Sequence, residues 1–238
     1  MSVFGKLDLL PRVSLAHTPT PIERLDNLSK ALDGGHLYVK RDDCTGLAMG
    51  GNKARQLEYY FGEAVQQEAD TILITGAVQS NFVRMAAAAA AKLDLACHIQ
   101  LEERVNDIGA NYRDSGNVLL DHILGATIHT YPDGEDEAGA DANLQSIANE
   151  LRLAGKRPYI IPLAMGHPPL GALGYIQAAI ELKSQLEKSD FEIDQIFVAS
   201  GSGSTHAGLL FGCRSLKWPI RITGVCVRRR REQQINRI

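Results

Sequence analysis

Short apolar runs rich in β-branched residues alternate with helical stretches along almost the whole chain of 238 residues. The alternation predicts strands at 36–41, 71–75, 96–101, 126–130, 158–161, 195–199 and 220–227. Helices are predicted at 53–69, 81–93, 109–124, 141–153, 172–186 and 205–216. Strands that alternate with helices of this length form parallel sheets covered on both faces, so we expect an α/β fold.

Charge and hydropathy exclude two classes of partner. The net charge is -3 and the isoelectric point is near 6.2, which argues against nucleic acid and against anionic membranes. No apolar run approaches the roughly 20 residues that span a bilayer. The N-terminal residues lack the charged-then-apolar order of a signal peptide, so we expect a cytoplasmic protein. The four cysteines form no CxxC pair, and we expect reduced core thiols and no metal site.

The sequence Gly50-Gly51-Asn52-Lys53 stands at the start of the helix predicted at 53–69. Two glycines allow a sharp turn, and the N–H groups of a helix start favour an anion. A lysine cation fits poorly there because the positive end of the helix dipole lies close to it. The misfit is relieved if the amine is bound to an aldehyde cofactor whose phosphate lies nearby. The alternative is a solvent-exposed lysine without function.

Polar residues also follow two predicted strands. Gln79, Ser80 and Asn81 follow the strand at 71–75, where ligand crevices open in α/β sheets, although Ser80 or Asn81 could simply cap the next helix. The loop 200–205 is Ser-Gly-Ser-Gly-Ser-Thr, whose free N–H groups and hydroxyls suit a dianion. It has no P-loop lysine and is not a dinucleotide fingerprint. A structural Gly/Ser turn is the alternative.

Four motifs together resemble one family. Gly50–Lys53, Gln79–Asn81, Gly171-Ala172-Leu173-Gly174-Tyr175 and the loop 200–205 occur in this order in the D-cysteine desulfhydrase and 1-aminocyclopropane-1-carboxylate deaminase family, which also includes L-cysteate sulfo-lyase-like proteins. The resemblance implies a fold-type II pyridoxal-phosphate enzyme, similar to the tryptophan synthase β subunit. Such enzymes have two three-layer α/β/α domains with mostly parallel sheets and the cofactor between them.

The resemblance also implies a role for each motif residue. Lys53 looks like the Schiff-base lysine that moves a proton at the α carbon, with Asn52 beside it at the cofactor. Ser80 looks like the catalytic serine near the substrate carboxylate, and Asn81 like the partner of the cofactor's ring hydroxyl. The phosphate loop is expected to comprise Gly201, Ser202, Gly203, Ser204 and Thr205.

The implied activity is β-elimination from a cysteine-like amino acid, which yields pyruvate, ammonia and a sulfur leaving group. L-Cysteate sulfo-lyase and 1-aminocyclopropane-1-carboxylate deaminase are the alternative enzymes within the family. The alternatives from other functional classes are a truncated, non-catalytic remnant that binds pyridoxal phosphate or a partner, and a simple phosphate-ligand binding domain. The resemblance also implies that the protein is a homodimer and that its substrate is a small amino acid.

Three departures from the family pattern concern the site. Phe82 stands where a histidine is common, so no acid/base group comes from that position. The segment 165–169 is Met-Gly-His-Pro-Pro where Gly-Gly-Ser-Asn is usual, on a loop expected to touch the substrate. The family also continues beyond Val227, so the chain is expected to be truncated at its C-terminus.

The expected domain division has a smaller domain at 52–163 and a larger, incomplete cofactor-binding domain built from 1–51 and 164–238. Two charged stretches are expected to have no role in function. The acidic stretch 133–141 is predicted to be a solvated turn, and the four arginines at 228–231 a solvated segment after a buried strand.

Overall fold

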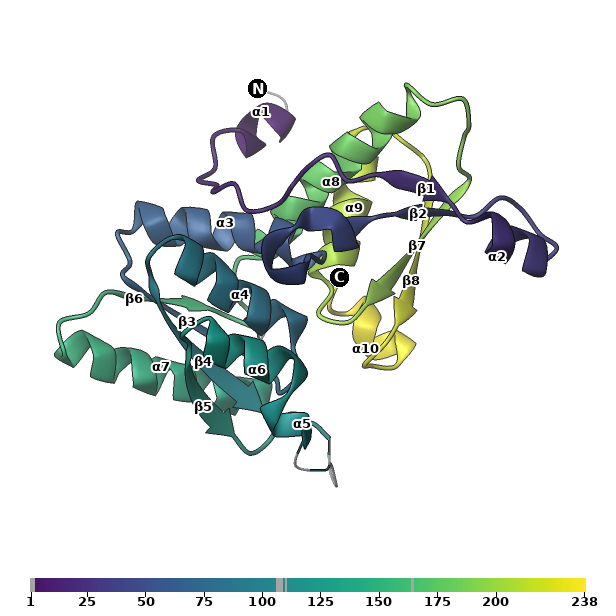
Figure 1. Cartoon of the computed structure of the whole chain (residues 1–238). Coiled ribbons are helices and arrows are strands. Elements are labelled where there is room, and N and C mark those ends of the chain that lie inside the picture. Colours follow the sequence, from purple (N-terminus) through teal and green to yellow (C-terminus); the bar gives the residue numbers. More distant parts are fainter. Residues whose placement is uncertain (1–2, 106–108, 110, 164) are drawn as a thin grey trace.

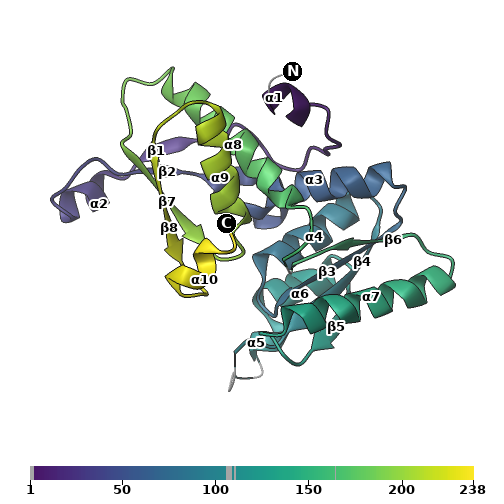
Figure 2. The same cartoon turned by 180° about the vertical axis from the view of Figure 1, so that it is seen from behind.

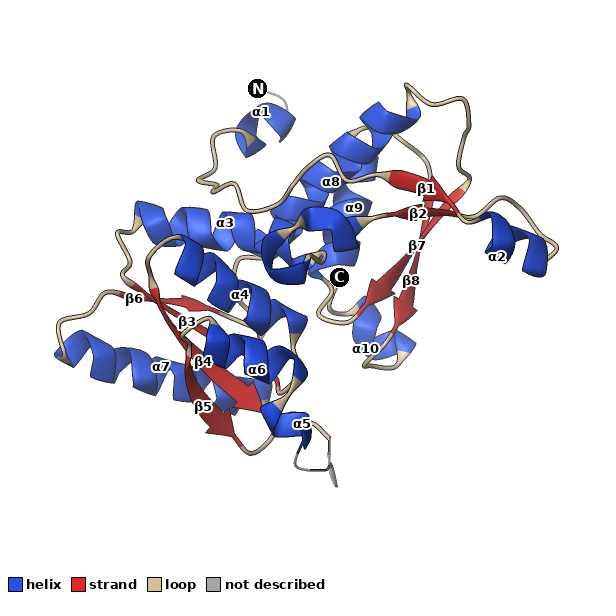
Figure 3. Ribbon diagram, viewed as in Figure 1, coloured by secondary structure: helices blue, strands red, loops and turns tan. Residues whose placement is uncertain are grey.

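The structure is a computed structural model that describes residues 3–105, 109, 111–163 and 165–238. Its largest sheet has four parallel strands in the order β5-β4-β3-β6 (Figures 1 and 3). These strands are β3 (Thr71–Ala77), β4 (Ala96–Glu102), β5 (Thr127–Tyr131) and β6 (Pro158–Ile161). Strand β3 lies inside the sheet, which explains why its residues through Gly76 are all buried. The α/β prediction is confirmed.

Helices cover both faces of this sheet. Ile72 and Ile74 point to one face, where α3 (Lys53–Gln66) and α4 (Asn81–Lys92) complete the main core. Leu73 points to the other face and packs with residues of α7 (Glu137–Leu153). Successive side chains of a strand alternate between faces, and an unbroken apolar run therefore supplies both cores.

Two smaller sheets lie beside the first. Strands β1 (Ile22–Arg24) and β2 (Tyr38–Lys40) are antiparallel, whereas β7 (Gln195–Ser200) and β8 (Arg221–Cys226) are parallel. Helices α8 (Leu170–Leu186) and α9 (Ser204–Ser215) pack against β7 and β8, as the views from both sides show (Figures 1 and 2). The division of the chain at residues 52 and 163 remains a prediction, although the four-stranded sheet lies wholly between these residues.

Glycines allow α8 to pack closely on its neighbours. A Cβ atom at Gly174 would overlap the carbonyl of Arg55 on α3, and one at Gly208 on α9 would overlap the carbonyl of Ala172. Both close approaches involve backbone atoms, which cannot rotate away as a side chain can. Two glycines thus fix α3 and α9 against α8 and, with them, the two loops that begin these helices.

Three predictions about elements were wrong. The region 109–124 is not one helix but α5 (Asn111–Asp114) and α6 (Gly116–Ile123), separated near Gly116 at φ +60°; Ala110 lies outside the described residues. Helix α7 starts at Glu137 and not at 141, because Asp136 accepts a hydrogen bond from the N–H of Gly139 and caps it.

The strand predicted at 220–227 is not buried. Ile220 is buried, but Val225 and Val227 are exposed, as is Phe197 on β7. Helix α9 covers one face of the two-stranded sheet, and no described residue buries these apolar side chains on the other face.

Several short elements carried no clear sequence signal. They are α1 (Val3–Leu7), β1, α2 (Asp26–Ala31), the 3₁₀ turns η1 (Asp42–Thr45) and η2 (Leu47–Met49), and α10 (Arg231–Ile235). Each is too short for a hydrophobic period to be recognised. Among the described residues, no helix is both long and apolar enough to cross a membrane.

Candidate active site

A cavity of about 600 Å³ lies where the four-stranded sheet meets the β7–β8 unit. Its wall is built from the start of α3, the turn after β3, the loop between β6 and α8, the loop after β7 and the C-terminal residues. Turns that follow parallel strands β3, β6 and β7 all reach it, which is the usual place for a ligand in an α/β fold. Of the predicted site residues, Lys53, Ser80, Gly201, Ser202, Gly203 and Ser204 line this cavity.

Lys53 is the first residue of α3. Burial lowers the pKa of its amine to about 8, because removal from water penalises the charged form. Among the described residues, no Asp or Glu side chain lines the cavity to restore that charge, and the permanently charged side chains of its wall are Arg104, Arg228 and Arg237. The amine can therefore lose its proton near neutral pH, which a nucleophilic lysine requires.

The loop after β7 joins directly to the first turn of α9. Gly203 has φ +101° and is the N-cap of a helix of 12 residues, to which it offers no capping side chain. The N–H groups of this first turn are accordingly available for a ligand, and they favour a dianion. A Cβ atom at Gly203 would lie 3.2 Å from the carbonyl oxygen of Arg237. A side chain would therefore be crowded here, and the positive φ would strain its backbone, so both effects favour glycine.

Ser80 and Asn81 begin α4. The hydroxyl oxygen of Ser80 accepts hydrogen bonds from the N–H groups of Phe82 and Val83 at 3.2 and 3.3 Å, so the capping role is present together with a place in the cavity wall. The Oδ1 atom of Asn81 accepts hydrogen bonds from Arg84 and Asn117. The side-chain NH₂ group of Asn81 is left as the donor for a ligand.

Arg84 connects two of the sequence motifs. Its guanidinium donates to Asn81 and to the carbonyl oxygens of Ala48 and Gly50. The loop that leads into Lys53 is thereby held against the start of α4.

Asn52 and Thr205, the remaining predicted site residues, contact each other. The side-chain amides of Asn52 and Gln56 both donate to the hydroxyl of Thr205, over 3.2 and 2.8 Å. Thr205 is on α9 and the two amides are at the start of α3. The hydroxyl consequently fixes the predicted phosphate loop at a set distance from Lys53. Gln56, which also lines the cavity, was missed in the sequence because a glutamine within an amphipathic helix gives no signal.

The arginines after β8 are not all a solvated segment, contrary to prediction. Arg228, Arg229 and Arg237 all form ion pairs with the carboxylate of Glu137, and their side chains are only 19, 17 and 8% exposed. Arg229 and Arg237 also donate to the carbonyl oxygens of Gly201 and Ser202. Glu137, at the start of α7, is likewise no part of a solvated turn. This cluster joins α7 to the predicted phosphate loop.

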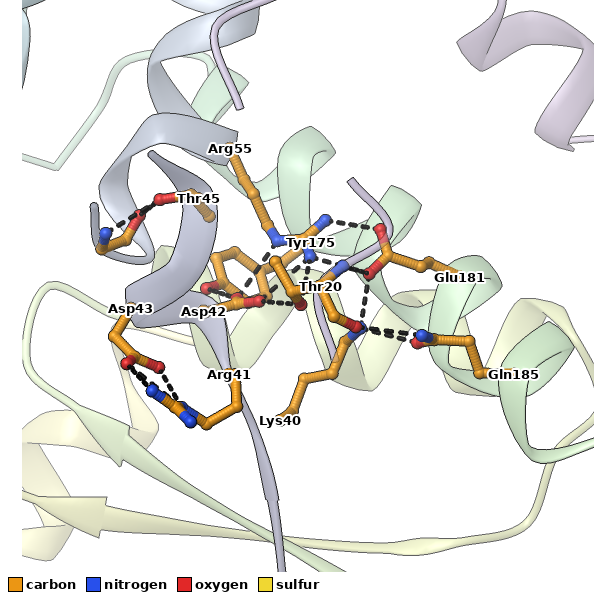
Figure 4. Close-up of polar contacts among 11 residues, drawn as sticks. Thr20, Lys40, Arg41, Asp42, Asp43, Thr45, Arg55, Tyr175, Glu181 and Gln185 are labelled. Atoms are coloured by element: carbon orange, nitrogen blue, oxygen red, sulfur yellow. Dashed lines mark hydrogen bonds and ion pairs between the residues drawn. The ribbon is translucent and has the colours of Figure 1, made fainter. Parts of the chain in front are cut away.

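A network of largely buried charges surrounds Arg55, two residues after Lys53 on α3 (Figure 4). Arg55 donates to Asp42 and Glu181 with N–O distances of 2.9–3.1 Å. The hydroxyl of Tyr175 donates to Asp42 at 2.6 Å, and Lys40 donates to Glu181 at 2.5 Å. The network joins β2, η1, α3 and α8, and Tyr175 ends the predicted motif 171–175.

The cofactor that the sequence resemblance implies fits this cavity. It needs a lysine that loses its proton readily and a cradle for a phosphate, and Lys53 and the start of α9 provide these in the cavity wall. Asn81, the predicted donor to the ring hydroxyl, begins α4 next to Ser80 but does not itself line the cavity. In the part of the chain that the structure describes, no group of three His, Cys, Asp or Glu residues could hold a metal ion. Cys44 and Cys226 are exposed, so the prediction of core thiols holds only for Cys97 and Cys213.

Comparison with known proteins gives the same picture. A family model described as "Pyridoxal-phosphate dependent enzyme" matches residues 13–234. The chain is 40% identical to D-cysteine desulfhydrase of Serratia proteamaculans over all of this chain and 71% of that protein. It is 42% identical to D-cysteine desulfhydrase of Salmonella paratyphi B over 94% of this chain and 66% of that protein. The chain thus spans about two thirds of the length of these relatives.

Solved structures resemble the chain to different degrees. A crystal structure of a homologue of ACC deaminase superposes with a TM-score of 0.85 at 38% identity, covering 99% of this chain and 68% of that one. A fungal L-serine ammonia-lyase from Rhizomucor miehei has a TM-score of 0.68 at 18% identity, covering 90% of this chain and 61% of that one. The second likeness concerns the fold alone.

Proposed function

The chain belongs to the pyridoxal-phosphate dependent enzyme family, and from this we propose that it is a lyase that removes a sulfur leaving group from the β carbon of a cysteine-like amino acid. The products are pyruvate, ammonia and the sulfur species. The observation that carries the proposal is the readily deprotonated Lys53 in one cavity with the Gly201–Ser204 loop. The names and identities of the D-cysteine desulfhydrases support the choice of leaving group.

Lys53 has two tasks in this proposal. Pyridoxal phosphate, when bound, supplies an aldehyde for the lysine amine and a ring that withdraws electrons from the α carbon of the substrate. The amine of Lys53, when not bound to the cofactor, would accept the α proton of the substrate. A pKa of about 8 suits a group that accepts and returns protons near neutral pH.

Other residues hold the cofactor and substrate in the proposal. The N–H groups at the start of α9 bind the phosphate, and the arginine–Glu137 cluster keeps their loop in place through the carbonyls of Gly201 and Ser202. Asn81 donates from its NH₂ group to the ring hydroxyl, since Arg84 and Asn117 occupy its oxygen. Ser80, in the cavity wall, binds the substrate carboxylate.

The test is pyruvate release by the purified chain with added pyridoxal phosphate and D-cysteine. We expect release by the unaltered protein and loss of release in Lys53→Ala. Lys92→Ala is the matched control, since Lys92 is an exposed lysine at the end of α4 and does not line the cavity. Pyruvate release that survives in Lys53→Ala, or none from D-cysteine or L-cysteate with the unaltered chain, would overturn the proposal.

Two alternatives within the family differ from this activity in their substrates and products, which separate assays with each substrate identify. An L-cysteate sulfo-lyase would release pyruvate with sulfite instead of sulfide. A deaminase of 1-aminocyclopropane-1-carboxylate would release a four-carbon keto acid, because the ring opens without loss of a leaving group. The similarity to the solved structure of an ACC deaminase homologue is the reason to test this last reaction.

The proposal includes a homodimer in the cytoplasm. Its support is the resemblance to the family. Sedimentation equilibrium of the purified chain measures the oligomeric state, and cell fractionation measures the location.

A further inference from the structure

A histidine lies in the wall of the same cavity as Lys53. His167 belongs to the loop between β6 and α8, and its side chain is 49% exposed. Its Nε2 atom is 3.4 Å from Oδ2 of Asp141 on α7, a residue that does not itself line the cavity. The imidazole therefore contacts a carboxylate through one nitrogen and keeps Nδ1 for another partner.

The carboxylate of Asp141 lacks a hydrogen-bond donor. Its side chain is 17% exposed, and neither carboxylate oxygen accepts a hydrogen bond from any group that the structure describes. A carboxylate withdrawn from water without donors is costly. A protonated His167 offers the charge and the N–H group that this carboxylate lacks. The pair has the form of an imidazole that is oriented by an acid.

The other ionisable side chains of the cavity wall, apart from Lys53, are less suited than His167 to donate a proton to a substrate. Arg104, Arg228 and Arg237 contribute guanidinium groups, which serve as hydrogen-bond donors and ion-pair partners. Burial raises the pKa of Tyr60, so its phenol gives up a proton less readily. Phe82 lines the cavity without any ionisable group. His167 brings an imidazole to this wall, and imidazole is the side chain that most often serves as a general acid or base in enzymes.

We infer that His167, oriented by Asp141, is a catalytic general acid that protonates the departing sulfur atom, an inference that rests on the proposed β-elimination. Lys53 takes the proton from the α carbon, and the electron pair of that C–H bond forms the double bond between the α and β carbons. The bond from the β carbon to sulfur breaks and its electron pair leaves with sulfur. His167 gives sulfur a proton, so hydrogen sulfide departs, and the neutral imidazole takes a new proton from water.

The test compares two substrates that differ in their need for an acid. Sulfur leaves from D-cysteine more easily when protonated, whereas chloride leaves from β-chloro-D-alanine without a proton, and both give pyruvate. We expect His167→Asn to lower kcat for D-cysteine by about 100-fold, within the usual range for a general acid. With β-chloro-D-alanine we expect a change below about threefold. Asp141→Asn should lower only the D-cysteine rate, by about tenfold.

His122→Asn is the matched control, because His122 is an exposed histidine near the end of α6 and does not line the cavity. The absorbance of the bound cofactor in His167→Asn reports an assembled site. Equal losses with both substrates would mean that His167 only positions the substrate, and an unchanged D-cysteine rate would remove it from the reaction; either result overturns the inference alone. Failure of the unaltered chain with both substrates would overturn the proposed function together with it.

Discussion

The side-chain amide of Gln56 donates a hydrogen bond of 2.8 Å to the hydroxyl of Thr205. The two residues are 149 positions apart in the sequence, and both are buried. One belongs to the helix that Lys53 begins and the other to the helix that follows the Gly201–Ser204 loop. This contact links the predicted lysine and phosphate sites of the cavity.

Thr205→Val keeps the shape of the side chain but removes the acceptor of both Asn52 and Gln56. We expect the free energy of unfolding to fall by about 1–3 kcal/mol, because buried amide donors are left without partners. Urea unfolding measures this change. Thr205→Ser, which keeps the hydroxyl, should stay within about 1 kcal/mol of the unaltered protein; equal losses in the two variants would contradict the role of the hydroxyl.

Arg55→Met should be severely destabilising. Arg55 is 3% exposed and neutralises Asp42 and Glu181, which are themselves largely buried. Loss of one partner from a buried ion pair costs about 3–5 kcal/mol. Arg41→Met is the control, because Arg41 makes comparable ion pairs at the surface; its midpoint of denaturation should hardly move. Similar midpoints for both variants would show that burial of the Arg55 network does not matter.

The same network makes the stability of the fold depend on pH in the acidic range. Burial alone would raise the pKa of Glu181, but its hydrogen bonds with Arg55 and Lys40 lower it. A carboxyl whose folded pKa lies below its unfolded value stabilises the fold above that unfolded value, and the contribution is lost as the pH falls through the lowered pKa. Stability measured from pH 7 to pH 3 should therefore fall less in Glu181→Gln than in the unaltered protein.

Ionisation of Asp121 should lower the stability of the fold as the pH rises, opposite to the effect of Glu181. Asp121 is fully buried on α6, neither carboxylate oxygen has a described hydrogen-bond partner, and burial raises its pKa to about 7, with Arg84 opposing. Because the folded state binds the proton more tightly, stability falls as the pH rises from about 4 to about 7. We expect Asp121→Asn to add about 2–4 kcal/mol at pH 8 and almost nothing at pH 4. A gain that is equal at both pH values, or one shared by the exposed Asp114→Asn, would contradict this account.

Removal of the Lys53 charge should stabilise the cofactor-free protein. Burial lowers the pKa of this amine to about 8, from 10.5. The unfolded chain binds the proton more tightly, so the cost is present in full below pH 8 and disappears as the pH rises to about 10.5. Lys53→Met should add about 2 kcal/mol at pH 7, less than the full shift implies because part of the side chain meets water in the cavity. Lys92→Met should add nothing.

The fold was predictable where hydrophobic periodicity decides the element. Strands such as β3 and β6 are continuous apolar runs, and α3, α4, α8 and α9 begin within about two residues of their predicted starts. The errors have physical causes. Gly116 takes a positive φ that interrupts the helix predicted at 109–124, and the cap at Asp136 starts α7 inside a stretch whose charge indicated a turn.

The site was predictable only through short motifs. Lys53, Ser80 and 201–204 meet in one cavity because strand ends and helix starts of parallel sheets converge. The arginine cluster on Glu137 and the His167–Asp141 pair join segments distant in sequence. No local pattern marks such pairs, because their partners are decided by tertiary packing. The roles of the individual motif residues remain predictions.

The central claim is that Lys53 carries pyridoxal phosphate, and reduction of the bound cofactor tests it most directly. The purified chain is mixed with pyridoxal phosphate, its absorbance is recorded before and after borohydride, and the labelled peptide is mapped by mass spectrometry. We expect an absorption band at the edge of the visible range that collapses on reduction and leaves the cofactor's mass on Lys53. A label on another lysine, or no band with excess cofactor, would contradict the account.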